Sequence, residues 1–485
     1  MAASSIPAIG VAVADGNRIL WEEGFGSADR ENGISATAHT PFYVASVTKA
    51  ITGTAVMLLH EHHRLELDRP VNNYLGSAKV HSPMWNPGGA TIRRVATHTA
   101  GLTTYNRKCA LQDTSCHVST DTAIQHYGIL FWPPGDHFDY SNLGYGILGE
   151  IVSRVSGRSY GEFIESELFR PLGMEDCFLE RRSGRPEATA AQYDSTSRER
   201  TPIQLSDTPG ASSVHCSAHD LALFGMFALG MHPPGQKQVL SDASLRMMLN
   251  PTVKTGEGER YGFGWSLQPN HHGYLGVFAQ GGTNDSFAVL QLIPSEKITI
   301  AVVANTGTTV PFEIVEEVLS ELLPRYRESS SAEKAATTRS ERPVTKALVG
   351  RWTGALHTWK GNFPLTVEIS ASREVHAKWD SGHWMKATDV DISEPRFYCI
   401  IHGLKGIPGA PQSPYDLELE LYLRAKTLVG AGTTKDDAQL PYWIQLEKSA
   451  ASLQGSVAVP SGQLQRGPSR RSACGSLIEP RKSAE

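Results

Sequence analysis

The 485-residue chain carries 45 Lys and Arg against 50 Asp and Glu, which gives a formal net charge of −5 at pH 7. Hydrophobic residues make up 40% of the chain and charged residues 20%, so a full core can form and wholesale disorder is excluded. The mild acidity argues against nucleic acid as the main partner, because phosphate binding needs clustered positive charge. We find no run of 18 apolar residues and therefore expect a soluble protein without a membrane span.

The first half of the chain predicts a hairpin followed by helices. Residues 6–28 hold two apolar runs on either side of the turn Asp15-Gly16-Asn17, a pattern typical of two antiparallel strands. Apolar residues recur at helical spacing from Val47 to Leu67, and Asp68-Arg69-Pro70 is expected to end that helix. Further helices are predicted at 142–155 and 160–169 among long loops.

Beyond Tyr261 the apolar period returns to two, which predicts strands. We expect them at 262–267, 287–293 and 298–303, followed by a closing helix at 311–323. Residues 326–345, rich in Ser, Thr, Ala and charge, read as a linker. Residues 346–448 predict a small antiparallel barrel or sandwich, with strands at 351–357, 364–370, 375–379, 384–392, 397–401, 417–423 and 442–447. The Ser-, Gly- and Arg-rich end, 449–485, is predicted to be a disordered tail.

Six cysteines in 485 residues do not make a disulfide scaffold. Cys109 and Cys116 lie in one short loop and could pair, but our interpretation is a set of reduced, mostly buried thiols. No Cys-x-x-Cys is present, so a zinc ribbon is not expected.

The sequence Ser46-Val47-Thr48-Lys49 is a candidate nucleophile and base. Positions i and i+3 share a helix face, so the Lys49 amine can reach the Ser46 oxygen and, if desolvated to the neutral form, take its proton. A second copy, Ser331-Ala332-Glu333-Lys334, falls in the linker, where catalysis is implausible. Ser46 instead opens a predicted apolar helix, whose start offers backbone N–H groups and a favourable dipole.

Two further motifs carry groups suited to acyl transfer. In Tyr140-Ser141-Asn142 the tyrosine can relay a proton, and the asparagine can orient a lysine and a substrate carbonyl. Gln280-Gly281-Gly282-Thr283 precedes a predicted strand, where paired glycines let a substrate lie close to the strand edge.

Together these motifs carry a family resemblance. Four motifs occur in one order: Ser46–Lys49, His98-Thr99-Ala100-Gly101-Leu102, Pro134-Gly135 with Tyr140–Asn142, and Pro171-Leu172-Gly173-Met174. Over residues 6–325 the chain resembles the penicillin-binding-protein/β-lactamase-like serine hydrolases, in the branch of class C β-lactamases, β-lactamase-fold carboxylesterases and D-aminopeptidases. The resemblance implies an α/β fold of the α+β type: a β-lactamase/transpeptidase-like antiparallel sheet flanked by helices, with a helical subdomain. Some members carry a C-terminal lipocalin-like barrel, which residues 346–448 resemble.

The resemblance implies a role for each matching residue. Ser46 would be the acylated nucleophile and Lys49 its activating partner, while Tyr140 moves the proton and Asn142 hydrogen-bonds Lys49 and the substrate. The oxyanion hole would be the N–H groups of Ser46 and Thr283, with Gln280, Gly281 and Gly282 beside the substrate. No metal or cofactor is implied.

Two features depart from the family pattern. The third motif usually begins with Lys or His, and the neutral Gln280 offers no charge to grip a substrate carboxylate. This disfavours penicillins and D-Ala-D-Ala peptides and favours neutral esters or amides, or a slow or degenerate enzyme. The family also has a helix, and often a signal peptide, before the first strand, so either the reading frame is clipped or that helix is absent. The compartment is therefore open: cytoplasmic as written, though relatives are often exported.

Other patterns have structural interpretations. Gly157-Arg158-Ser159-Tyr160-Gly161 matches Gly-x-Ser-x-Gly, but a helix rather than a strand precedes it, so it reads as a helix–helix connection. His60-Glu61-His62-His63 reads as a polar helix end, and His98 and His215 as structural histidines.

The sequence therefore predicts a serine hydrolase on small carboxylic esters, with a homo-oligomer through the barrel allowed. A β-lactamase or DD-peptidase and a D-aminopeptidase are the alternatives within the enzyme class. A catalytically degenerate binding or scaffold protein on the same fold is the alternative outside it.

Overall fold

Two antiparallel sheets of nine strands each organise the chain. The computed structural model describes residues 6–111, 113, 117–179, 189–250, 253–256, 258–326, 347–379, 382–410, 414–435 and 438–449. The predicted linker after Tyr326, the second Ser-x-x-Lys copy, Cys116, Cys474 and the tail after Ser449 lie outside these residues.

The first sheet joins the two ends of the hydrolase region. Its strands lie in the order β3-β2-β1-β14-β13-β12-β11-β10-β9, so the N-terminal hairpin adds to a meander whose strands begin only at Val253, with Ile9 opposite Ala304. The strands are β1 (Ala8–Asp15), β2 (Arg18–Asp29), β3 (Ile34–Ser35), β9 (Val253–Lys254), β10 (Arg260–Tyr261), β11 (Ser266–His271), β12 (Tyr274–Thr283), β13 (Ser286–Ile293) and β14 (Ile298–Ala304).

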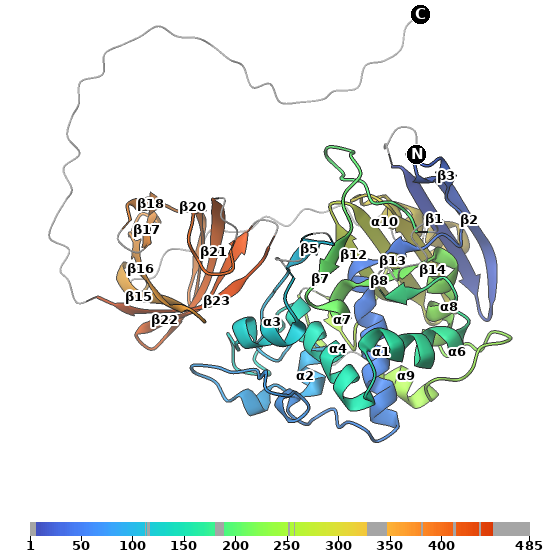
Figure 1. The fold of residues 1–485 in the computed structure, drawn as a ribbon, viewed down its shortest axis with the longest axis horizontal. Helices are drawn as coiled ribbons and strands as arrows, with labels where there is room; N and C mark the ends of the chain where they lie inside the picture. Colours follow the sequence, from blue (N-terminus) through green and yellow to red (C-terminus); the bar gives the residue numbers. More distant parts are fainter. Residues whose placement is uncertain are drawn as a thin grey trace, which may run out of the picture. The chain divides into compact units, whose positions relative to one another are not determined.

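Helices cover both faces of this sheet (Figure 1). Helix α10 (Val310–Leu322) packs on one face, and α8 (Ala218–Ala228) packs on the other beside α1 (Thr48–Glu61). Because both faces are covered, β1 is buried from Ala8 to Ala14 and reads as a continuous apolar run rather than an alternating one.

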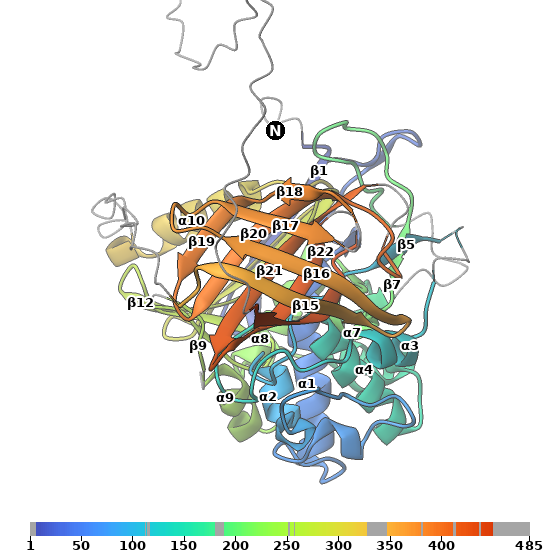
Figure 2. The same ribbon diagram turned by 90° about the vertical axis from the view of Figure 1, so that its left-hand side faces the viewer.

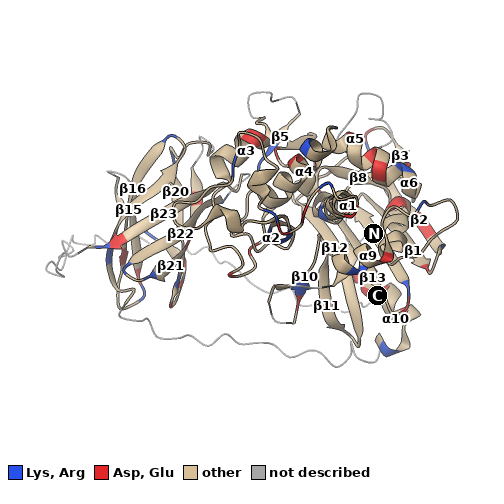
Figure 3. Ribbon diagram, turned by 90° about the horizontal axis from the view of Figure 1, so that it is seen from below, with Lys and Arg blue, Asp and Glu red and all other residues tan. Residues whose placement is uncertain are grey.

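Short helices, turns and strands complete the hydrolase region. The helical elements are η1 (Ala45–Val47), η2 (Val71–Asn73), η3 (Pro87–Gly89), α2 (Ile92–Ala96), α3 (Thr120–Tyr127), α4 (Asn142–Ser156), α5 (Tyr160–Ile164), the π-helical η4 (Glu165–Phe169), α6 (Arg170–Leu172), α7 (Pro209–Ser212) and α9 (Asp242–Leu249). The small strands are β4 (Phe42–Tyr43), β6 (Phe178–Leu179) and β8 (Val214–Cys216) in one sheet, and β5 (Lys108–Ala110) and β7 (Gln204–Ser206) in another. Acidic and basic residues are interspersed along α3 to α6 in Figure 3, and Arg154 bonds both Asp121 and Glu150 there.

The second sheet curls into a nearly closed barrel, seen face-on in Figure 2. Its order is β18-β17-β16-β15-β23-β22-β21-β20-β19, and the two end strands are separated in sequence only by Ala387, which brings the sheet edges together. The strands are β15 (Gly350–Thr358), β16 (Gly361–Ile369), β17 (Val375–Trp379), β18 (Trp384–Lys386), β19 (Thr388–Ser393), β20 (Arg396–Leu404), β21 (Tyr415–Arg424), β22 (Thr427–Lys435) and β23 (Pro441–Lys448).

The predicted architecture is confirmed, with several local corrections. The Gln280–Thr283 motif, predicted only to precede a strand, itself forms the end of strand β12. The Ser46 helix ends at Glu61 rather than Leu67, because the polar His60–His63 run closes it and His63 takes a left-handed φ of 56°. Residues 262–265 form a bend rather than a strand. Gly264 has a positive φ of 84°, and a Cβ at this position would meet the Lys49 carbonyl oxygen at 2.3 Å. Strand β22 was not predicted, because it contains glycines and is buried along nearly its whole length. Its apolar residues therefore do not alternate with polar ones as in the other barrel strands.

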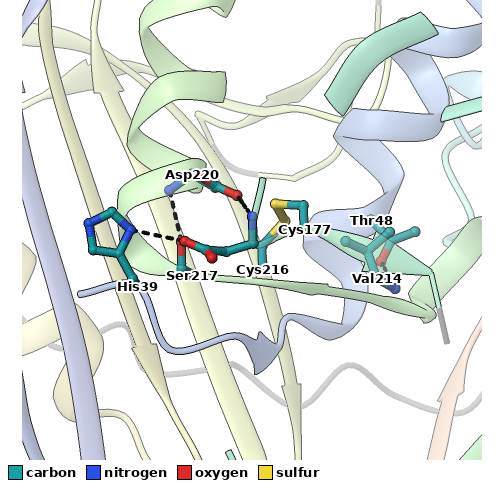
Figure 4. The surroundings of a disulfide bond; sticks show 8 residues. His39, Thr48, Cys177, Val214, Cys216, Ser217 and Asp220 are labelled. Carbon is teal, nitrogen blue, oxygen red and sulfur yellow. Dashed lines mark hydrogen bonds and ion pairs between the residues drawn. A yellow bond between two sulfur atoms is a disulfide. The ribbon is translucent and has the colours of Figure 1, made fainter. Parts of the chain in front are cut away.

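The cysteines also differ from prediction, since Cys177, just before β6, forms a disulfide with Cys216 at the end of β8 (Figure 4). Their separation of 39 residues leaves no local signal in the sequence. Cys109 is disulfide-bonded as well, while Cys399 is a buried free thiol. No helix among the described residues is long and apolar enough to cross a membrane.

Residues 1–449 cluster as one unit, and apolar contacts join the barrel strands to the hydrolase region. Ile129, Phe131 and Trp132 form one buried cluster with Val429, Ala431 and Trp443. Nearby, Asn106 and Gln439 exchange backbone hydrogen bonds of 2.9 and 2.8 Å.

Candidate active site

Ser46 lies in a strained turn at the start of α1. Strand β4 ends at Tyr43, and Ala45 then takes a positive φ of 44°, which is unusual for a residue with a Cβ. The 3₁₀ turn Ala45–Val47 follows and runs directly into α1. This turn presents the Ser46 side chain at the cleft rather than in the core.

Lys49, one helical turn further on, is 1% exposed. Its Nζ lies 2.9 Å from Ser46 Oγ, 2.7 Å from Asn142 Oδ1 and 3.0 Å from the carbonyl oxygen of Ala211. A neutral amine has two N–H donors and one lone pair. Those groups match two acceptors, Asn142 and Ala211, and one donor, the Ser46 hydroxyl.

Helix α4 delivers the second motif to this lysine. Ser141 caps the helix by accepting the Gly144 N–H at 3.1 Å, which places Asn142 in the first turn and Tyr140 just before it. Tyr140 lines the cleft together with Ser46, and Lys49 Nζ lies 4.7 Å from the centre of the Tyr140 ring. The sequence candidates Ser46, Lys49, Tyr140 and Asn142 therefore meet at one point.

The buried His98 supports Tyr140 from behind. Its Nδ1 accepts the Ser141 backbone N–H at 3.1 Å, and its ring lies 4.4 Å from that of Tyr140. Tyr145 and Tyr261 pack on the same imidazole. Burial holds the pKa of His98 well below its usual value, so the ring is neutral.

Burial shifts the pKa values of Lys49 and Tyr140. It holds the pKa of Lys49 well below the usual lysine value, and the charge of Lys108 adds to the effect. Burial raises the pKa of Tyr140 to about 12, although the nearby Ser46 opposes the shift. At neutral pH the tyrosine is therefore a proton donor, and the lysine is the group suited to act as base.

The third motif lies on β12, across the cleft from Ser46. A Cβ on Gly281 would meet the Val44 carbonyl at 2.3 Å and the Ser46 nitrogen at 2.4 Å, so only glycine fits between β12 and Ser46. Gln280 is exposed and lines the cleft together with Gly281 and Gly282. Thr283 ends the strand, and its hydroxyl donates to Asp285 at 2.5 Å.

The cleft over Ser46 has a volume of about 290 Å³. Its walls include the rings of Phe138, Tyr140, Tyr261, Phe278 and Phe287. Among the described residues that line it, Glu259 alone carries a charge, and the walls supply no cation for a carboxylate.

Several residues of this site were not predicted from the sequence. Ala211, whose carbonyl binds Lys49, lies in the small-residue stretch Pro209–Ser212, and a Cβ on Gly210 would meet the Tyr145 carbonyl at 2.5 Å. Gly210 was the one sequence feature that could have indicated this close packing. No sequence feature indicated that Glu259 lines the cleft, because single glutamates are common in loops.

The rejected motifs have structural roles. Ser159 caps α5 in a capping box with Glu162, which confirms the helix–helix connection. Glu61 accepts hydrogen bonds from Ser241, at the end of α1. His215 packs between Tyr43 and Phe178.

The fold and this constellation define a class of protein. The β-lactamase family profile matches residues 1–322, and the chain belongs to the β-lactamase family, a family of serine hydrolases. Protein flp of Staphylococcus aureus is 26% identical over 342 residues, covering 67% of this chain and 65% of that protein. The unguisins hydrolase ungD' of Aspergillus campestris is 24% identical over 339 residues, covering 65% and 62%.

The chain thus spans about two thirds of the length of these curated relatives. A solved structure extends the likeness of fold to the barrel. The octameric penicillin-binding protein homologue from Pyrococcus abyssi has a TM-score of 0.58 and 21% identity, covering 92% of this chain and 97% of that chain.

Proposed function

We propose that the protein is a carboxylesterase that hydrolyses small neutral esters through an acyl-Ser46 intermediate. The observation that carries the proposal is the contact of Ser46 Oγ with Lys49 Nζ at 2.9 Å, made by a lysine that is buried and whose pKa is lowered. Lys49 takes the Ser46 proton as the oxygen attacks the ester carbonyl. Tyr140 then protonates the leaving alkoxide, and water releases the acid in the reverse sequence.

Asn142 and the oxyanion donors complete this mechanism. Asn142 accepts one Lys49 N–H, which points the amine lone pair at Ser46. The backbone N–H groups of Ser46 and Thr283 bind the developing oxyanion, and one such donor is worth about 10²–10³ in rate. The fit of Gly281 against the Ser46 nitrogen supports this pairing, because it holds β12 beside the nucleophile.

The cleft lining supports an uncharged substrate. Penicillins and D-Ala-D-Ala peptides carry a carboxylate near the scissile bond, and a cation normally binds it. Gln280 is neutral, and Glu259 would repel that carboxylate. A neutral ester avoids this cost.

Glu259 also favours a second candidate, a D-aminopeptidase. A carboxylate in the cleft can pair with the free ammonium group of an amino-acid amide. One variant distinguishes the two candidates. In Glu259→Gln, kcat/KM should fall for a D-amino-acid amide and stay unchanged for a neutral ester.

The catalytic proposal is tested by intact-mass spectrometry after incubation with a fluorophosphonate. We expect one adduct that maps to Ser46, disappears in Ser46→Ala and persists in the matched control Ser159→Ala. No adduct would favour a binding protein on the same fold.

Substrate class is tested separately with p-nitrophenyl butyrate, nitrocefin and D-alanine p-nitroanilide. We expect the ester to have the highest kcat/KM. Faster nitrocefin turnover, or a stable acyl adduct of nitrocefin on Ser46, would replace the esterase with a β-lactamase or DD-peptidase. Faster release from the anilide would establish the aminopeptidase.

A further inference from the structure

Two histidines and two carboxylates meet outside the cleft, at the edge where β2, α8 and the segment before β4 come together. Glu22 lies on β2, His39 just before β4, Asp176 just before β6 and His219 in the first turn of α8. His219 Nδ1 lies 2.7 Å from Glu22 Oε2, and His39 Nε2 lies 3.7 Å from Glu22 Oε1. The two imidazole rings are 4.3 Å apart.

The spacing of these atoms fits a metal ion. One donor atom from each of Glu22, His39 and His219 lies within 4.8 Å of the other two. Bonds of about 2.0–2.2 Å in a tetrahedral zinc site separate neighbouring donors by about 3.4 Å. Small side-chain rotations therefore bring the three residues to the required distances.

Asp176 fixes the tautomer of His39. Its Oδ2 lies 2.9 Å from His39 Nδ1, so that nitrogen carries the proton and donates it. The lone pair then falls on Nε2, the nitrogen that faces Glu22. A carboxylate behind a histidine in this way orients metal-binding imidazoles and raises their basicity.

The backbone around the cluster is held in place. The Asp176 N–H donates to Asp220 Oδ2 at 2.7 Å, and the neighbouring Cys177 is bonded to Cys216, three residues before His219. Figure 4 shows His39 and Asp220 beside this disulfide. The His39 side chain is 55% exposed, so a cation and a water ligand can reach the cluster from solvent.

We propose that His39 Nε2, His219 Nδ1 and the Glu22 carboxylate bind a divalent cation of the zinc class. Asp176 orients His39, and water fills the remaining position. Imidazole ligands select zinc, nickel or copper over magnesium or calcium. On binding, the His219 proton moves from Nδ1 to Nε2 by exchange with solvent, so that the Nδ1 lone pair can coordinate the ion. The bound ion would link β2 to α8 and to the segment that leads to Ser46.

A second group of candidate ligands carries no such proposal. Cys109, His117 and Asp207 also lie within metal-binding distance of one another, but Cys109 is disulfide-bonded. Its sulfur is therefore not available as a thiolate ligand.

The test is calorimetric titration of the full chain, freed of any histidine tag, with zinc chloride, repeated with magnesium chloride. We expect one zinc per chain and no magnesium binding. His39→Ala and His219→Ala should lose the site, while Asp176→Asn should weaken it about 10- to 100-fold. The control His402→Ala should bind normally, since His402 forms a comparable 2.9 Å pair with Asp416 on the barrel.

A second measurement keeps the result interpretable if a variant is unstable. Zinc should raise the melting temperature of the wild type and of His402→Ala but not of His219→Ala, with folding of each metal-free variant checked by circular dichroism. Absence of stoichiometric binding, or binding retained in both His39→Ala and His219→Ala, would show that the cluster is only a hydrogen-bonded surface group. Binding lost instead in His60→Ala would assign the ion to the helix end and overturn the proposal.

Discussion

Lys49 can serve as a base only when it is uncharged, and its surroundings decide that state. Among the described residues, no carboxylate bonds its Nζ; the contacts are a hydroxyl, an amide oxygen and a carbonyl oxygen. Desolvation therefore acts on the ammonium without an opposing charge, and the cation Lys108 adds to it.

This lowered pKa predicts the pH dependence of kcat/KM. The reactive form is the free amine, so the rate rises with pH through the pKa of Lys49 and then levels off. Because that pKa is well below its usual value, the plateau should begin well below about pH 10. A rate still rising tenfold per unit near pH 10 would mean that the lysine is charged at neutral pH.

Lys49→Arg tests the same residue without removing its bulk. A guanidinium does not deprotonate in proteins, so we expect kcat/KM to fall about 10²–10⁴-fold. The control is Lys378→Arg on β17 of the barrel, which should leave the rate unchanged. Both are measured with the best ester of the substrate panel.

Gln280→His tests the departure in the third motif. A protonated imidazole can donate a charged hydrogen bond where the amide donates a neutral one, a difference of about 1 kcal/mol, or roughly fivefold in rate. We expect turnover of acyl substrates to rise by about that factor at mildly acidic pH. Gln125→His, on an exposed position of α3, is the control. Unchanged kinetics for esters and β-lactams alike would mean that this position does not act on the substrate.

At the scale of elements, the site depends on the approach of β12 to the turn before α1. Gly281 pairs with Ala288 on β13, so its position is fixed by the sheet, while its Cα packs against Val44 and Ser46. Both contacts are made by backbone atoms, which cannot rotate away as a side chain can.

Gly281→Ala should therefore displace the strand or the nucleophile. We expect at least 100-fold loss of kcat/KM, with an overpacking cost of about 1–3 kcal/mol in the free energy of unfolding. Gly256→Ala is the matched control, because its added Cβ would meet nothing within 4 Å. Kinetics and urea unfolding measure the two effects, and a fully active Gly281→Ala would contradict the described fit.

At the scale of the whole molecule, the buried cluster around Trp132 and Trp443 ties the barrel to the hydrolase region. Trp443 is 1% exposed and sits against Phe131, with ring centres 6.1 Å apart. An interface of this kind couples the unfolding of the two parts.

Trp443→Ala should separate them. We expect the wild type to unfold in one calorimetric transition and the variant in two. The free energy of unfolding should fall by about 3–5 kcal/mol in the variant. Trp384→Ala is the control, because that ring is 42% exposed. Two transitions in the wild type would show that the parts are energetically independent. Homo-oligomer formation through the barrel stays a prediction, which light scattering of the full chain can test.

The sequence by itself determined the elements whose signal is local. Hairpin 6–28, the helix that begins near Ser46, the strands around β13 and β14 and most barrel strands follow from side-chain period and turn residues. The contact between Ser46 and Lys49 could likewise be predicted, because side chains three residues apart lie on the same face of a helix.

Only the tertiary structure decided what depends on distant segments. Lys49 meets Asn142 from 93 residues away and Ala211 from 162, and these contacts, with the burial they bring, set its pKa. The Cys177–Cys216 disulfide and the His39–His219 cluster could not be predicted from the sequence either, because only the folded chain brings these residues together. Contacts between residues far apart in the chain produce no periodic pattern in a single sequence. The sequence therefore predicted the candidate catalytic residues, but not the buried surroundings that set their pKa values.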